Sequence, residues 1–299
     1  AFARYGNGNN NLYGDYINGG LPRFPANPDS FPGRTRESHS QGGAVGLNSV
    51  LGPNTVNELS LGFTRNTISF LDPTHPKFEV VFNTIADPFQ NWGGTGRIPE
   101  NSQILDNFSF VRANHTFKTG FTGRYYRINQ FRRATNFYPR FTFGTGDAPV
   151  FLRTGPDPIS LAGINSNDRS NLNSLFNDLM GVVGTVRKVF YSNGTTFPSG
   201  DNELRFAQRN REYNFFFQDD WRVSSRLTLN LGVRYEFNSV PYDKSGMQVV
   251  ADKPLGSRTG DVTLLPAGPG TGRTWYENDL NNFAPAVGFA WSPFGNQKT

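Results

Sequence analysis

Adjacent carboxylates at Asp219 and Asp220 are the residues in this 299-residue chain whose types and spacing first suggest chemistry. Paired carboxylates can divide acid and base roles when both side chains reach the same space. Here they lie within "REYNFFFQDDWRVSSRLTLNLGVRYEFN", residues 211–238, which largely alternates apolar and polar residues. Successive side chains of a β-strand point to opposite faces, so this pair cannot act together. We expect both to be polar anchors near a turn at Ser224–Ser225.

Other candidates for catalysis or metal binding are sparse. His39, His75 and His115 lie far apart without ligand spacing, and the chain contains no cysteine. Residues 6–15, "GNGNNNLYGD", lack the regular aspartate spacing of a Ca²⁺-binding loop and are predicted to form a flexible loop. Nucleophile-elbow, zinc-protease and P-loop patterns are absent. We therefore predict no catalytic, cofactor-binding or metal site, and a protein that is not an enzyme.

Charge and composition narrow the class further. Lys+Arg 29 against Asp+Glu 24 gives a net charge of +5, spread along the chain without a basic stripe, which argues against nucleic-acid binding. No apolar run is long enough for a transmembrane helix. The 33 glycines, 20 prolines and 14% aromatic residues are typical of β-strands joined by irregular loops.

The two-residue alternation predicts an all-β protein of about eight strands, joined by short turns at one end and long loops at the other. The expected strands are a stub at Phe2–Tyr5 and residues 40–50, 55–66, 103–112, 115–131, 209–222, 226–238 and 281–292. The expected long loops are about 6–38, 67–102, 133–204 and 239–280. Within the third loop we expect a short helix, Asn171–Met180, resting on the sheet. An extended segment after it should pair with a strand beginning near Glu203.

Each predicted strand has two distinct faces. Leu227, Leu229, Leu231, Val233, Tyr235 and Phe237 lie on one face of 226–238, opposite Arg226, Thr228, Asn230, Gly232, Arg234 and Glu236. Such a strand fits a soluble β-sandwich, or a transmembrane β-barrel whose apolar face meets lipid. The strand length, the unequal loops and the aromatic rings near strand ends favour the antiparallel barrel. These rings are Tyr125, Trp221, Tyr235, Phe237 and Trp291.

Several stretches resemble the barrel of TonB-dependent outer-membrane receptors, in particular the group with an N-terminal carboxypeptidase-regulatory-like domain. They are "FFFQDDWRVSSRLTLNLGVRYEF", "DNFSFVRANHTFKTGFTGRYYR", "TVNELSLGFTRN", "SLFNDLMG" and "NNFAPAVGFAWSPFGNQKT", in the order the family has them. The resemblance implies a barrel of about 22 strands around a plug domain, importing a scarce extracellular solute with energy from a TonB-type coupling protein. Residues 1–299 would then be a central part of that single β-barrel domain, without the plug, the coupling region, the N-terminal strands or the C-terminal strands.

The expected partners are outer-membrane lipid, the plug and remaining strands, the coupling protein and an unidentified solute, with no cofactor. Lumen-facing Arg124, Arg222, Arg234 and Glu236 are expected to form a cross-strand charge ladder or to contact the plug or solute. Loop-tip aromatic residues are expected mainly to pack within the loops, with ligand stacking as the alternative. These residues are Tyr13, Tyr16, Phe24, Phe31, Trp92, Phe137, Tyr138 and Trp275. Two other functions stay open, a structural or adhesive outer-membrane barrel and a secreted β-sandwich binding module.

Overall fold

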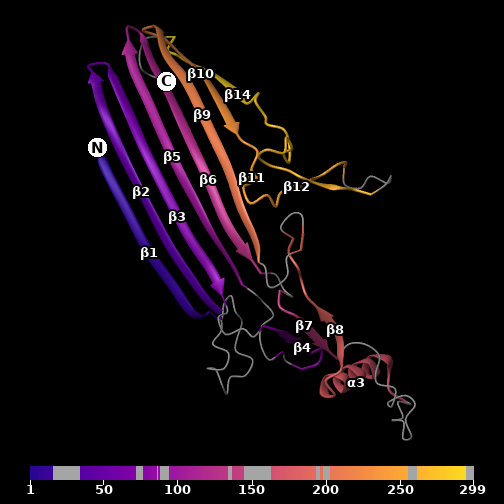
Figure 1. Ribbon diagram of the computed structural model, residues 1–299. Helices are drawn as coiled ribbons and strands as arrows, with labels where there is room; N and C mark the ends of the chain where they lie inside the picture. Colours follow the sequence, from indigo (N-terminus) through magenta and orange to yellow (C-terminus); the bar gives the residue numbers. More distant parts are fainter. Residues whose placement is uncertain are drawn as a thin grey trace.

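The computed structural model contains one large antiparallel sheet, with its long loops at one end (Figure 1). It describes residues 1–15, 34–71, 77–85, 87, 94–133, 137–144, 163–192, 196–197, 203–254 and 261–293. Neighbouring strands follow the order β1-β2-β3-β5-β6-β9-β10-β14, and β11 adds to β9. The sheet is open in the described part of the chain, with β1 and β14 at its edges. The all-β antiparallel fold predicted from the alternation is confirmed.

The strands of the large sheet are long. They are β1 (Phe2–Asp15), β2 (Arg34–Gly52), β3 (Thr55–Leu71), β5 (Thr95–Arg112), β6 (His115–Arg132), β9 (Leu204–Ser224), β10 (Leu227–Asn238), β11 (Tyr242–Asp243) and β14 (Phe283–Trp291). Apart from β11 and the nine-residue β14, all have 12 or more residues, whereas strands of soluble proteins average about 5–6. This length exceeds what a tilted membrane crossing needs, about 9–11 residues.

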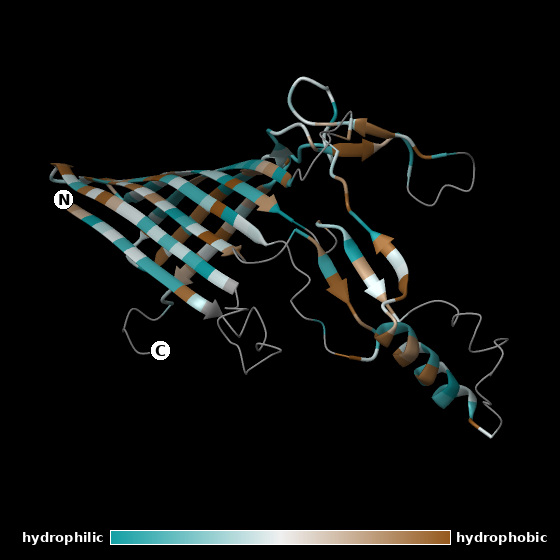
Figure 2. Ribbon diagram, turned by 60° about the horizontal axis from the view of Figure 1, so that its bottom comes forward, coloured by the Kyte–Doolittle hydropathy of each residue, from teal (hydrophilic) through white to brown (hydrophobic). Residues whose placement is uncertain are grey.

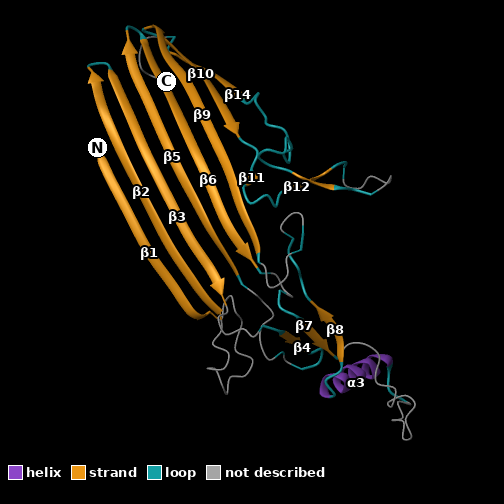
Figure 3. Cartoon of the chain, viewed as in Figure 1, coloured by secondary structure: helices purple, strands orange, loops and turns teal. Residues whose placement is uncertain are grey.

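Three tight turns close one end of the sheet. They lie between β2 and β3 at residues 53–54, between β5 and β6 at 113–114, and between β9 and β10 at 225–226. Ala113 takes a φ of 54°, the left-handed conformation that hairpin turns require. Figure 3 shows the opposite end, where the connections are long and carry the smaller elements. The predicted asymmetry between short turns and long loops is therefore correct.

The strands extend further into the loop end than the sequence predicted. Residues 6–15, expected to be a flexible loop, belong to β1 and pair with β2 from Gly42 to Arg34. Residues 67–71, 95–102 and 204–208 are likewise strand. Residues 6–11 are polar on both faces, so no alternation marks them, and backbone pairing with β2 together with side-chain contacts such as His39–Asn7 holds them in the sheet. Residues 67–71 and 204–208 do alternate, but over too few residues to be separated from the loops that follow or precede them.

The loop end contains two small sheets and a helix. One sheet has the order β4-β7-β8, formed by Glu79–Val81, Arg140–Phe143 and Val183–Arg187, and the other pairs β12 (Val249–Ala251) with β13 (Leu264–Pro266). The predicted partner of the extended segment was wrong, because β8 pairs with β7 rather than with a strand from Glu203. A partner at 140–143 had no alternation long enough to reveal it.

Helix α3 spans Ser166–Leu179 and begins earlier than predicted. Asn165 caps it by accepting a hydrogen bond from the Asp168 backbone at 2.9 Å, a signal that the sequence analysis passed over. The helix does not rest on the large sheet by an apolar face, since its leucines stay exposed and its buried residues are Asn177 and Asp178. Asp178 instead accepts hydrogen bonds from Asn83 and Thr84 after β4.

No second layer covers either face of the large sheet within the described residues. The buried hydrophobic residues among them are Phe137, Val240 and Ala267, none in a long strand of the large sheet. Val287 and Phe289 of β14 remain 80% and 71% exposed. The β-sandwich alternative is therefore wrong, because a sandwich buries this face between its sheets. Among the described helices, none has the length and apolar character to cross a membrane.

Candidate functional site: the two faces of the sheet

The strand register places the apolar positions of neighbouring strands on one shared face. Val233 of β10 pairs with Phe217 of β9, which pairs in turn with Thr119 of β6. Figure 2 shows the resulting bands of apolar and polar residues crossing the sheet. We call this side the apolar face, and its rows include Leu61, Ile104, Phe121, Phe215, Tyr213, Leu231, Val233 and Val287. The opposite side is the polar face.

The apolar face has the height of a lipid core. From Leu227 to Phe237 the strand rises about 33 Å, or about 25 Å along the membrane normal at a tilt of about 40°, which matches the apolar band of outer-membrane barrels. Trp221 and Trp291 lie near the short turns, and Tyr125 and Phe237 lie towards the loops. The predicted aromatic residues thus border the band at both ends, as rings at membrane interfaces do.

The acids within the apolar band have polar partners on neighbouring strands. At the short-turn end, the Asp219 carboxylate lies 2.8 Å from His115 Nδ1, and the imidazole stacks between Phe117 and Trp221 at 5.3 Å from each ring. Asp106 is higher on this face and accepts a hydrogen bond of 2.6 Å from Asn57 Nδ2. Asp106 was not among the residues predicted to have a role, although its even-numbered spacing from Phe108 and Phe110 places it on the same face.

The polar face carries charges that bridge adjacent strands. Lys118 Nζ of β6 lies 2.8 Å from Asp220 of β9, so the two neighbouring aspartates have partners on opposite faces, as predicted. Arg124 contacts Glu212 at 3.3 Å.

Arg124 also donates to Gln103 of β5 at 3.1 Å, which extends its contacts over three strands. Arg234 and Glu236 form an ion pair along β10, and the Arg222 side chain is exposed. These contacts confirm part of the expected charge ladder.

Phe216 is the apolar exception on the polar face, and the structure explains it. Phe216 pairs directly with Gly120, and its ring covers the glycine so closely that a Cβ there would lie 2.3 Å from Cε1. Phe131 covers Gly96 in the same way. An aromatic ring over a cross-strand glycine restores packing that the missing side chain would have provided.

A buried carboxylate fixes the β10–β14 loop to β9. Asp243 is 3% exposed and accepts hydrogen bonds from the backbone of Ala207 at 2.6 Å and of Met247 at 3.0 Å. Ser245 donates through both its backbone and its hydroxyl. Burial acts to raise the pKa of Asp243, but these hydrogen bonds outweigh it and hold the pKa below its usual value.

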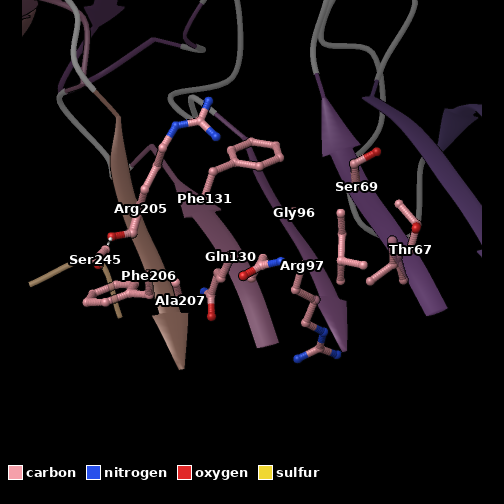
Figure 4. A pocket seen from close by; sticks show the side chains of 13 residues that line it. Thr67, Ser69, Gly96, Arg97, Gln130, Phe131, Arg205, Phe206, Ala207 and Ser245 are labelled. Carbon is pink, nitrogen blue, oxygen red and sulfur yellow. Dashed lines mark hydrogen bonds between the residues drawn. The ribbon is translucent and has the colours of Figure 1, made fainter. Parts of the chain in front are cut away.

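Next to this anchor lies a hollow of about 440 Å³ over the loop ends of β3, β5, β6 and β9 (Figure 4). Phe131 and Gln130 point to opposite sides there, as do Arg205 and Phe206. The hollow is lined mainly by apolar atoms and holds no cluster of titratable groups. It therefore offers packing space without the convergent polar groups of a catalytic site.

The other predicted candidates are dispersed. His39 contacts Asn7 at 2.7 Å, far from His115, and no group of three potential metal ligands occurs in the described part of the chain. Phe137 is buried against Tyr138 and Tyr191, as loop packing predicts, whereas Tyr13 and Trp275 are exposed. His75, Tyr16, Phe24, Phe31 and Trp92 lie outside the described residues.

A single antiparallel sheet with tight turns at one end, long loops at the other and an uncovered apolar face about 25 Å high is the wall of an outer-membrane β-barrel. Sequence comparison agrees, because the profile of the outer membrane beta barrel domain matches residues 1–299. The chain belongs to this family, and its location is the outer membrane.

A solved structure with similarity to the chain is the outer membrane transporter YddB from Escherichia coli, at 12% sequence identity and a TM-score of 0.36. The similarity covers 71% of this chain and 23% of the transporter, so the chain spans about a quarter of that protein. No curated protein matches the chain.

Proposed function

We propose that the chain is part of the barrel wall of a TonB-dependent receptor for energised uptake of a scarce solute. In this proposal further strands close the barrel, a plug domain fills it, and the chain performs no chemistry of its own. A TonB-type protein supplies the energy through a region outside residues 1–299. The chain contributes a lumen wall and the loops that meet the solute first.

The observation that carries the proposal is the charged polar face at mid-height of the apolar band. Lys118 and Asp220 form an ion pair near mid-height, and Arg124, shared between Gln103 and Glu212, lies towards the loop-side end of the band. Charges at this depth require an interior that holds water or a polar protein surface. A wide lumen occupied by a plug satisfies both conditions, whereas a narrow barrel filled by apolar side chains satisfies neither.

The loop end supports the same proposal. Its connections have their own small sheets, a capped helix and carboxylate anchors at Asp178 and Asp243. Loops that merely joined strands would need none of these. Ordered surface loops of this length usually carry recognition.

The experiment compares solute depletion from a complex medium by three strains. The first strain expresses the full-length protein and the energy-coupling protein. The second expresses the full-length protein but lacks the energy-coupling protein. The third lacks the full-length protein. Mass spectrometry of the spent medium should find at least one solute that only the first strain removes. The control is a porin substrate, whose uptake should be equal in all three strains.

Two results would oppose the proposal. If the same solutes are removed with and without the coupling protein, transport is passive. If no solute depends on the full-length protein, while its loops bind cells or surface polymers, the structural or adhesive barrel becomes the better assignment. In both cases the location and the two-sided wall remain as described.

A further inference from the structure

A cluster of arginines lies on the apolar face just beyond its aromatic border. We define the arginine cluster as Arg65 of β3, Arg127 of β6 and Arg211 of β9, gathered around Glu100 and Tyr125. The register assigns all five residues to the side that carries Leu61 and Phe121, and not to the polar face. Three cations around one carboxylate leave a surplus of positive charge on the lipid side of the sheet.

The contacts within the cluster fix the guanidinium groups without neutralising them. Glu100 is 14% exposed and forms ion pairs with Arg65 at 3.2 Å and with Arg127 at 3.1 Å. Arg127 and Arg211 lie over the Tyr125 ring, at 5.9 and 5.7 Å from its centroid. Arg65 and Arg127 nevertheless remain 43% and 38% exposed, which leaves N–H donors facing outwards.

The cluster lies at the height of lipid headgroups. Its arginines are about 11 to 14 residues from the short turns of their strands. At about 2.5 Å of height per tilted residue, they lie about 28–36 Å above those turns, beyond an apolar band about 25 Å tall. Tyr125, two residues before Arg127, marks the interface itself.

We propose that the arginine cluster binds the phosphate groups of anionic lipid in the leaflet on the loop side of the membrane. A planar guanidinium matches two phosphate oxygens, and two or three of them at one height match a phosphorylated headgroup. Glu100 and Tyr125 serve to hold the arginines apart and extended. Arg209, which pairs with Arg127, continues the positive row towards β11.

The test uses full-length protein in detergent and diphosphorylated lipid A as the probe. Arg127→Gln with Arg211→Gln removes two cations from the cluster. The matched control, Arg112→Gln with Arg226→Gln, removes two exposed arginines at the short turns. A cation near a charged membrane surface contributes about a fivefold gain in affinity, so the first variant should bind the lipid about 30-fold more weakly and the control should equal the parent.

Further measurements test whether binding depends on the phosphate groups of the lipid and on the side chain at position 127. Lipid A without phosphates should bind the parent as weakly as the double variant binds the phosphorylated form, and excess inorganic phosphate should not displace the lipid. Arg127→Lys, which keeps the charge but loses the planar guanidinium, should bind the lipid more weakly than the parent and more tightly than the double variant, and it gives a second measurement if the double variant fails to fold. Equal binding by parent and double variant, equal loss in the control, or full displacement by inorganic phosphate would overturn the proposal.

Discussion

Replacing Val233 by arginine tests the assignment of the apolar face most directly. Val233 lies one residue from the midpoint between Leu227 and Phe237, and its direct partners across the sheet are Phe217 and Pro285. No acidic residue is therefore next to it in register to neutralise a new cation. Leu231 is less suitable, because it pairs with Asp219.

The expected cost follows from depth. Arginine facing lipid at the bilayer midplane destabilises a barrel by about 2–4 kcal/mol, and the cost falls to about 0–1 near the interfaces. Leu229 lies four residues closer to the short turn, about 10 Å lower at the strand tilt of such barrels. We therefore expect Val233→Arg to cost about 2–4 kcal/mol and Leu229→Arg about 1 or less.

The assay is urea unfolding of the full-length protein in lipid vesicles, followed by its altered gel mobility when folded. Asn230→Arg is the matched control, because Asn230 lies on the polar face opposite Asp220. It should stay within about 0.5 kcal/mol of the parent, as surface substitutions usually do. If Val233→Arg is no less stable than Asn230→Arg, the face that meets lipid has been assigned wrongly.

Two further predictions concern packing and pH. Gly120→Val should destabilise the barrel by about 1–3 kcal/mol, since its Cβ would displace the Phe216 ring, whereas Gly62→Val, with no atom within 4 Å, should be neutral in the same unfolding assay. Asp243 has a lowered pKa in the folded state, so its anchor is fully stabilising above the unfolded pKa of about 3.9 and is lost as pH falls through the folded value. Proteolysis of the β10–β14 loop should accelerate below about pH 4 in the parent, and Asp243→Asn should make cleavage fast and nearly independent of pH. An equally protected loop in that variant would contradict the anchor.

The sequence predicted the sheet wherever the two faces meet different surroundings. Residues 226–238 alternate because one face meets lipid and the other a polar interior, and the structure has β10 at Leu227–Asn238. The two faces of Asp219 and Asp220 followed from the same parity. The register between neighbouring strands then follows from the short turns that join them.

The same reasoning failed where both faces meet water. β1 continues through "GNGNNN" because its backbone pairs with β2 and because side chains such as Asn7 contact their neighbours across the pair. Composition alone assigns such a stretch to a loop. Helix α3 was predicted at Asn171–Met180, but the contacts of the buried Asp178 that orient it were not predicted. A contact across more than 90 residues leaves no local pattern in sequence.

The positions of charge on the apolar face follow one rule. His115 lies at the short-turn rim and contacts the carboxylate of Asp219, which pairs with Leu231 within the band, whereas the arginine cluster lies beyond the opposite rim, where water or headgroups reach it. Asp106 also lies within the band, and its partner is a neutral amide. An acid costs less than a cation on a lipid-facing wall, and the amide of Asn57 satisfies one of its oxygens at 2.6 Å. Cations thus stay at the edges of the band, whereas the two acids within it are held by side chains of neighbouring strands.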